Sequence, residues 1–181
     1  MKGNGVAALK VWPVTVTLQG VTYRIAPLPA IRWVIPIVDG DMFGVVPGLL
    51  DADSTEAVSS GLLTGTISHQ DCLTAARSAI GVASGVPWWA AVRLVQSAIG
   101  VPDVVGEMTI SGVDATTVSL GGFVFAEYRV FTRDADKKQR AKIDREIMAP
   151  PPGISIAERQ AAQGDRGSGF EAMMRQRGAT E

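Results

Sequence analysis

The chain has very few of the residues that build disulfide frameworks and metal sites. Its 181 residues include one cysteine, Cys72, and one histidine, His69. A single cysteine excludes an internal disulfide framework and any zinc site with several cysteine ligands. It also fits a reducing compartment, where disulfides are rare.

An excess of either charge and a long apolar run are also missing. The formal net charge is −1, whereas proteins that mainly bind phosphate backbones need a strong basic excess. The most apolar stretch, residues 78–106, is interrupted by Pro87, Arg93, Gln96 and Pro102, and a membrane span needs about 20 mostly apolar residues. The N-terminus lacks the apolar core and cleavage site of a signal peptide. These absences predict a soluble protein that binds neither nucleic acid nor membrane.

Common enzyme motifs are absent as well. The sequence has no Walker loop, no GxGxxG after a strand, no GxSxG and no HExxH. His69 and Cys72 are three residues apart and can share a helical face, but a metal site needs three or four ligands. The acidic pairs at residues 39–41 and 51–53 lie in expected loops, where carboxylates usually solvate turns. We therefore expect no catalytic activity, no metal and no cofactor.

What the chain does have is apolar material and an uneven distribution of charge. Hydrophobic residues make up 46%, which is enough for a core. Of the last 49 residues 18 are charged, against 17 of the first 132. We predict a body over residues 1–132, formed by a β-hairpin and helices, and a more solvated segment over residues 133–181.

The segment at residues 14–25, VTVTLQGVTYRI, alternates strictly between apolar and other residues. With Gln19-Gly20 as a two-residue turn, this pattern predicts a β-hairpin with one apolar side. A lone hairpin is marginal in water, so it must lie on helices or pair with another chain. We expect its edge to pair with copies of this protein through Val14, Val16, Tyr23 and Ile25.

Helical signals follow the hairpin. Pro29 and Pro36 suggest the beginning and end of one short helix that turns Ile31 and Trp33 or Val34 inward, and residues 39–52 read as loop. Helices are predicted to begin at the capping boxes Asp53–Glu56 and Ser68–Asp71 and at Pro87, and to end at Gly61 or Gly65, at Gly81 and at Gly100. A short helix is expected at 103–111 and a turn at Asp114.

The C-terminal part predicts one long helix followed by a tail. Ser119 is expected to cap a helix over about 119–148 whose charged second half projects into solvent, and APPPG at 149–153 stops it. Two further capping boxes occur at Ser155–Glu158 and Ser168–Glu171. The predicted fold class is mainly α with an N-terminal β-hairpin (α+β), a small helical body, a long C-terminal helix and a flexible or partner-bound tail.

Within that tail, Phe170, Met173 and Met174 fall at i, i+3 and i+4 and form one apolar stripe. A helix this short does not hold itself together in water, and methionine adapts to varied apolar surfaces. The stripe therefore predicts a partner-binding segment over 168–177, with a disordered, solubilising tail as the alternative.

The adjacent Trp88 and Trp89 open the helix after Pro87 and point about 100° apart. One interpretation places Trp88 in the core and Trp89 at its margin. A second makes Trp89 an exposed anchor for a protein partner. A third, base stacking, lacks the surrounding basic residues that it would need.

Three segments together resemble a protein family. They are the hairpin running into YRIAPLPAIRWV, the stretch PWWAAVRLVQSA, and SGVDATTVSLGGFVFAEYRVF, all within residues 14–34 and 86–131. The chain resembles the tail assembly chaperones of long-tailed, siphovirus-type phages that infect actinobacteria. This resemblance implies a non-catalytic protein that coats the hydrophobic tape measure protein and keeps it soluble until the tail tube polymerises.

The resemblance also implies partners and a location. Such chaperones are often made in two forms by ribosomal frameshifting, so the expected partners are the tape measure protein, copies of this chain and a frameshifted longer form. The expected location is the host cell cytoplasm, and the mature virion should lack the protein. The alternative is a structural virion component, such as a head-tail connector or a minor tail protein.

Overall fold

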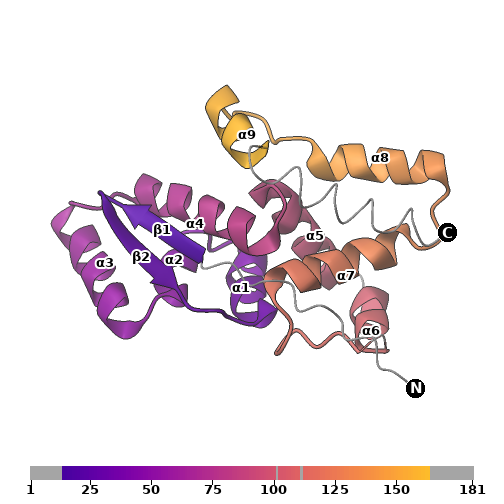
Figure 1. Ribbon diagram of the computed structural model, residues 1–181, viewed down its shortest axis with the longest axis horizontal. Coiled ribbons are helices and arrows are strands. Elements are labelled where there is room, and N and C mark those ends of the chain that lie inside the picture. The colour runs from indigo at the N-terminus through magenta and orange to yellow at the C-terminus, as the bar shows by residue number, and fades with distance from the viewer. Residues whose placement is uncertain (1–13, 101, 111, 164–181) are drawn as a thin grey trace, which may run out of the picture.

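The computed structural model describes residues 14–100, 102–110 and 112–163. In this part of the chain, a two-stranded sheet precedes nine helices (Figure 1). The elements are β1 Val14–Leu18, β2 Val21–Ile25, α1 Ala30–Val38, α2 Val45–Leu49, α3 Ala52–Thr64, α4 His69–Ser84, α5 Trp88–Gly100, α6 Pro102–Ile110, α7 Leu120–Thr132, α8 Lys137–Met148 and α9 Ile156–Gln163. The predicted α+β class with an N-terminal hairpin is confirmed.

The hairpin forms around Gln19 and Gly20, as predicted. Both residues have positive φ, 48° and 79°, which is the type I′ geometry that matches the twist of paired strands. The register pairs Val14 with Ile25, Val16 with Tyr23 and Leu18 with Val21. The apolar face of β1 lies on α4 (Figure 1), so the hairpin gains its stability from a helix of the same chain.

Helix α1 passes through Pro36 instead of ending there. A proline in a helix interior removes one backbone hydrogen bond, but α1 buries Trp33, Val34 and Ile37 against the core, and this burial outweighs that loss. The expected loop at 39–52 contains α2, which buries Val45, Val46 and Leu49. Its apolar run is only five residues long and lies between turn residues, so the sequence pattern did not indicate a helix.

Two helix boundaries differ from the prediction. Helix α3 is capped by Asp51, whose side chain accepts from the Ser54 N–H, so the N-cap lies two residues before the predicted Asp53. Helix α4 begins at the predicted capping box of Ser68 and Asp71 but continues through buried Gly81 to Gly85. Gly85 has φ 74°, the left-handed conformation in which glycine ends helices.

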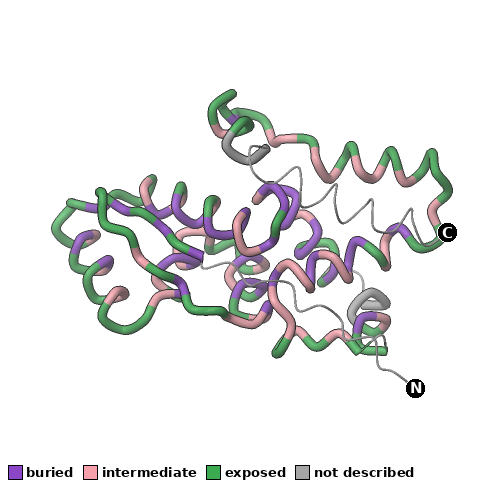
Figure 2. The backbone as a smooth tube through the Cα atoms, in the orientation of Figure 1, coloured by how far each residue is buried: buried purple, intermediate pink, exposed green. Residues whose placement is uncertain are grey.

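The core forms where α1, α4, α5 and α7 meet (Figure 2). Trp33, Ile37, Ile80, Val95 and Leu120 are among its fully or almost fully buried side chains. Helix α7 starts at Ser119, as predicted, with the Ser119 hydroxyl accepting from the Gly122 N–H. Gly121 lets α7 approach α4 closely, because a Cβ there would lie 3.2 Å from the carbonyl oxygens of Ala83 and Ser84.

The predicted long helix at 119–148 is two helices. Helix α7 ends at Thr132, and a second capping box formed by Asp136 and Gln139 starts α8. The chain reverses between them, so α8 folds back toward α5 (Figure 1), although its charged face stays exposed as predicted. The described part of residues 133–181 thus packs on the body that precedes it. Pro150 follows the last turn, and α8 ends at Met148 as predicted.

Candidate functional site

The two tryptophans occupy the opposite places to those expected. Trp89 is buried, with 3% of its surface exposed, whereas Trp88 is half-buried. Their rings meet edge to face with centroids 5.8 Å apart. Trp89 therefore belongs to the core in this structure, and its ring does not present an exposed anchor to a partner.

Trp89 and Arg93 hold the C-terminal end of α8. The Trp89 indole Nε1 donates to the Met148 carbonyl at 3.1 Å. One turn later, Arg93 Nη1 donates to the carbonyls of Glu146, Ile147 and Ala149. The last carbonyls of a helix have no partners within the helix and attract cations. The side of α5 that carries Trp89 and Arg93 is thus used to dock α8 of the same chain.

Trp88 belongs to a second contact, which fixes α9. The Arg77 guanidinium lies 4.7 Å from the centroid of the Trp88 ring and donates to Glu158 at 3.0 Å. Arg77 comes from α4 and Glu158 from α9, so this contact ties α9 to the body. The Ser155–Glu158 capping box is only half formed, because the Glu158 N–H donates to the Ser155 hydroxyl while its carboxylate binds Arg77.

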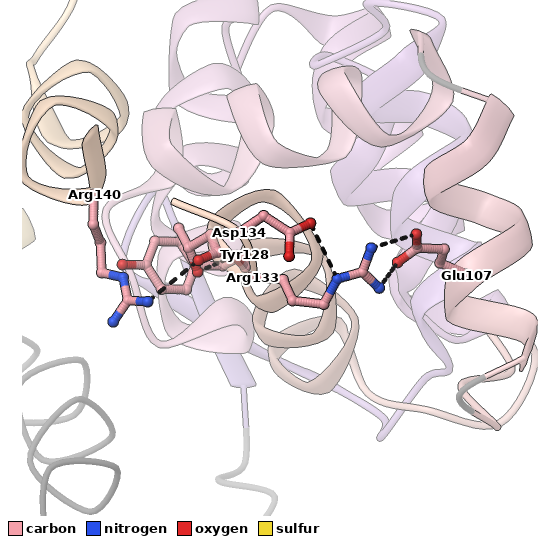
Figure 3. Close-up of polar contacts among 6 residues, drawn as sticks. Glu107, Tyr128, Arg133, Asp134 and Arg140 are labelled. Carbon is pink, nitrogen blue, oxygen red and sulfur yellow. Dashed lines mark hydrogen bonds and ion pairs between the residues drawn. The ribbon is translucent and has the colours of Figure 1, made fainter. Parts of the chain in front are cut away.

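Polar contacts also join the helices around the α7–α8 turn (Figure 3). The Tyr128 hydroxyl donates to Asp144 at 2.6 Å. Arg140 donates to the Thr132 carbonyl. Arg133, at the C-terminal end of α7, forms a bidentate ion pair with Glu107 of α6. Part of the predicted solvated helix is therefore held by specific contacts that need the tertiary structure.

Glu127 is the one acidic side chain that the described core encloses completely. It has no measurable exposed surface, and neither carboxyl oxygen has a hydrogen-bond partner among the described residues. Burial raises the pKa of Glu127 to about 9, against a smaller opposing effect from the backbone of Ala98. The carboxyl is thus neutral in the folded protein at pH 7. No sequence pattern distinguishes Glu127 from an ordinary surface glutamate.

His69 and Cys72, the residues considered for a metal or thiol role, have different surroundings. His69 is exposed and stacks against Phe43, with ring centroids 4.5 Å apart. Cys72 is buried, and burial, together with the nearby Asp71 charge, raises the pKa of its thiol. Asp71 caps α4. The described residues hold no group of three or more His, Cys, Asp or Glu side chains that suits a metal ion.

The hairpin residues expected at an oligomer edge are largely used within the chain. Val14, Val16 and Ile25 are buried and Tyr23 is half-buried. The side chains of Val14, Val16 and Ile25 are therefore used within the chain, which corrects that part of the prediction, whereas Tyr23 keeps part of its surface accessible. Phe170, Met173 and Met174 lie outside the described residues.

None of the described helices is by itself long and apolar enough to cross a membrane. Only α4 and α5 taken together reach that length and composition, and they are bent by 74° at the break between them. Comparison of the chain with protein families, curated proteins and solved structures finds no match.

Proposed function

We propose that this protein is a non-catalytic phage tail assembly chaperone, which binds the hydrophobic tape measure protein and keeps it soluble before the tail tube polymerises. Its partners are that client, copies of the chain and a frameshifted longer form. It acts in the host cell cytoplasm and is left out of the mature virion. The proposal rests on the resemblance of three segments, none of which carries an enzyme motif.

The observation that carries the proposal is that these three segments meet in space. They supply β1, β2 and α1, helix α5, and helix α7 with the loop before it. The N–H of Ala30 donates to the Val118 carbonyl at 2.7 Å, and that of Ile31 to the Ala115 carbonyl at 2.9 Å. Helices α1, α5 and α7 pack on one another. The stretches that carry the resemblance therefore build one structural unit, as expected if they were retained together.

The arrangement of reactive groups also favours a binding protein over an enzyme. An active site brings acids, bases or nucleophiles together in a pocket. Here His69 lies on the surface, Cys72 is buried, and Glu127 is enclosed on α7. The second candidate, a structural virion component, is also non-catalytic, so the two differ in the fate of the protein and not in its chemistry.

Their fates are distinguished by following the protein through an infection. The tagged chain is recovered from infected cells, its partner is identified by mass, and purified particles are tested for the chain. We expect a long, hydrophobic, helical partner in the lysate and no chain in the particles. Stoichiometric amounts in mature particles would favour the virion component and reject the chaperone.

Copies of this chain are proposed to associate through the backbone edge of β2. Val21, Thr22 and Arg24 are exposed, and β1 is the only strand that pairs with β2 in the described part of the chain. The two-residue turn makes Leu18 and Val21 a hydrogen-bonded pair, so the N–H and C=O groups of Thr22 and Arg24 point away from β1. The 3.1 Å contact between the Thr17 and Thr22 hydroxyls fits that non-bonded position. Such an edge can accept another strand.

Replacing Thr22 with proline tests this edge. Proline removes an N–H that the hairpin itself does not use, and edge strands tolerate it. We expect Thr22→Pro to shift the protein from oligomer to monomer in light scattering, alone or with client. Thr22→Ala also loses the hydroxyl contact but keeps the backbone N–H, so we expect it to keep the oligomer. If the unmodified chain is a strict monomer, the proposed self-association is wrong. If both variants stay oligomeric, the copies associate through a surface other than the edge of β2.

A further inference from the structure

An open groove runs between α7 and α8. Its volume is about 390 Å³, and it is lined by the half-buried apolar side chains of Val130, Phe131, Ala135 and Ile143. Polar and charged side chains stand at its rim, namely Asp134, Gln139, Lys142 and Glu146. An apolar floor between charged rims is the form of surface that receives one face of an amphipathic helix.

Helix α8 does not fill this groove by itself. No residue of α8 is fully buried (Figure 2), although the helix is held at its end by Trp89 and Arg93. Ile147 packs against the core, whereas Ile143, one turn earlier, is not among the described side chains that do. The apolar side chains of α8 therefore pack on the body only near the C-terminal end of the helix. Ile143, in the middle of the helix, stays half-buried and can be covered further by another apolar segment.

We propose that the chain's own segment 168–177 covers this groove as a short helix. Its apolar residues Phe170, Met173 and Met174 share one helical face, and unbranched methionines fit an irregular groove. A segment of this length is not stable as an isolated helix, so burial in the groove supplies the stabilisation that it lacks. The inference concerns the isolated chain and does not depend on the client proposed above.

The length of the chain allows this contact. Six residues, 164–169, join α9 to Phe170 and reach about 20 Å when extended. Ile143 lies five residues, about 8 Å, along α8 from the C-terminal end of that helix, and residues 149–155 join this end to α9. The contact between Arg77 and Glu158 holds α9 on the body. The tether therefore keeps the segment at a high effective concentration near the body and its groove.

Charge also favours this occupant. The rim presents two carboxylates, Asp134 and Glu146, against one cation, Lys142, which is 3.8 Å from Glu146. The segment ends with Arg175 and Arg177 after its apolar stripe. Their guanidinium groups complement the acidic rim, and this complementarity favours the chain's own segment over an acidic one.

Disulfide trapping in the full-length protein tests the proposal. We expect the pair Ile143→Cys and Met173→Cys to form an intramolecular disulfide under mild oxidation. Its yield should be about tenfold above that of Ala141→Cys with Met173→Cys. Ala141 is exposed, lies on the same helix and does not line the groove. The native Cys72 is buried and does not compete.

Non-reducing gels and peptide mass analysis separate the outcomes. A fast-migrating monomer that contains the 143–173 disulfide supports the proposal. Covalent dimers through the same pair would overturn it in favour of docking on a second copy. Equal yields from both pairs would also overturn it, because a solvated tail samples both positions alike. Each pair is first checked by circular dichroism and thermal unfolding, and an unfolded pair is replaced by Phe131→Cys with Phe170→Cys.

Discussion

Replacing Glu127 with glutamine is expected to remove most of the loss of stability that the protein suffers as pH rises. Glu127 has a folded-state pKa of about 9 and an ordinary value of 4.5. Between these pH values the folded protein holds a proton that the unfolded chain has released, so the free energy of unfolding falls as pH increases. The slope for one proton is about 1.4 kcal/mol per pH unit, which amounts to roughly 3 kcal/mol at pH 7.

The measurement is urea unfolding at pH 5 and pH 8, followed by tryptophan fluorescence. The unmodified chain should lose about 4 kcal/mol between these pH values, whereas Glu127→Gln should lose much less. Glu56→Gln serves as the control, because Glu56 is an exposed glutamate on α3. An unchanged slope in Glu127→Gln would show that this carboxyl does not carry the pH dependence.

Other carboxylates act in the opposite direction at low pH. Hydrogen bonds from the backbone and side chain of Ser54 lower the pKa of Asp51, and those from Ser68 lower the pKa of Asp71. Their stabilising contribution is present above their ordinary pKa and is lost as pH falls through the lowered value. From these three groups we expect the free energy of unfolding to be higher on the acid side of neutrality than above pH 7.

Trp89→Ala is expected to lower the free energy of unfolding by about 3–5 kcal/mol, the range for truncating a large buried aromatic side chain. The substitution leaves a cavity among core side chains and removes the hydrogen bond to the Met148 carbonyl. For a domain of this size, each kcal/mol shifts the thermal midpoint by roughly 2–4 °C. The midpoint should therefore fall by about 6–20 °C.

Trp88→Ala is the matched control, because the two residues are adjacent and differ in burial. Trp88 is half-buried, and its indole Nε1 is buried without a hydrogen-bond partner among the described residues. We expect Trp88→Ala to cost less than Trp89→Ala, because less of the Trp88 ring is buried. A larger loss at Trp88 than at Trp89 would contradict the placement of the two rings.

The hairpin and several helix starts could be predicted because their determinants lie within a few residues. Alternation at 14–25 and the Gln19-Gly20 turn define the hairpin, and Ser68, Asp114 and Ser119 act on N–H groups two or three residues away. The break at Asp136 was also readable, since Asp136 and Gln139 match a capping box. The apolar stripe that continues beyond it masked this signal.

Packing between segments that are distant in sequence determined the features that these local patterns did not predict. Trp89 is buried because it meets Met148, 59 residues later, and no property of the pair in sequence distinguishes it from Trp88. Pro36 and Gly81 stay within helices because the surrounding faces are buried in the core. Glu127 is neutral because α5 and α7 exclude water from it.

The sequence by itself determined the mainly helical class, the N-terminal hairpin and the apolar segments that build the core. Capping, turn and periodicity signals act over a few residues and need no tertiary contact. The tertiary structure alone decided the fold-back of α8, the choice of Trp89 for the core and the groove between α7 and α8. These features depend on which side chains meet across the chain, where burial is large enough to override local preferences.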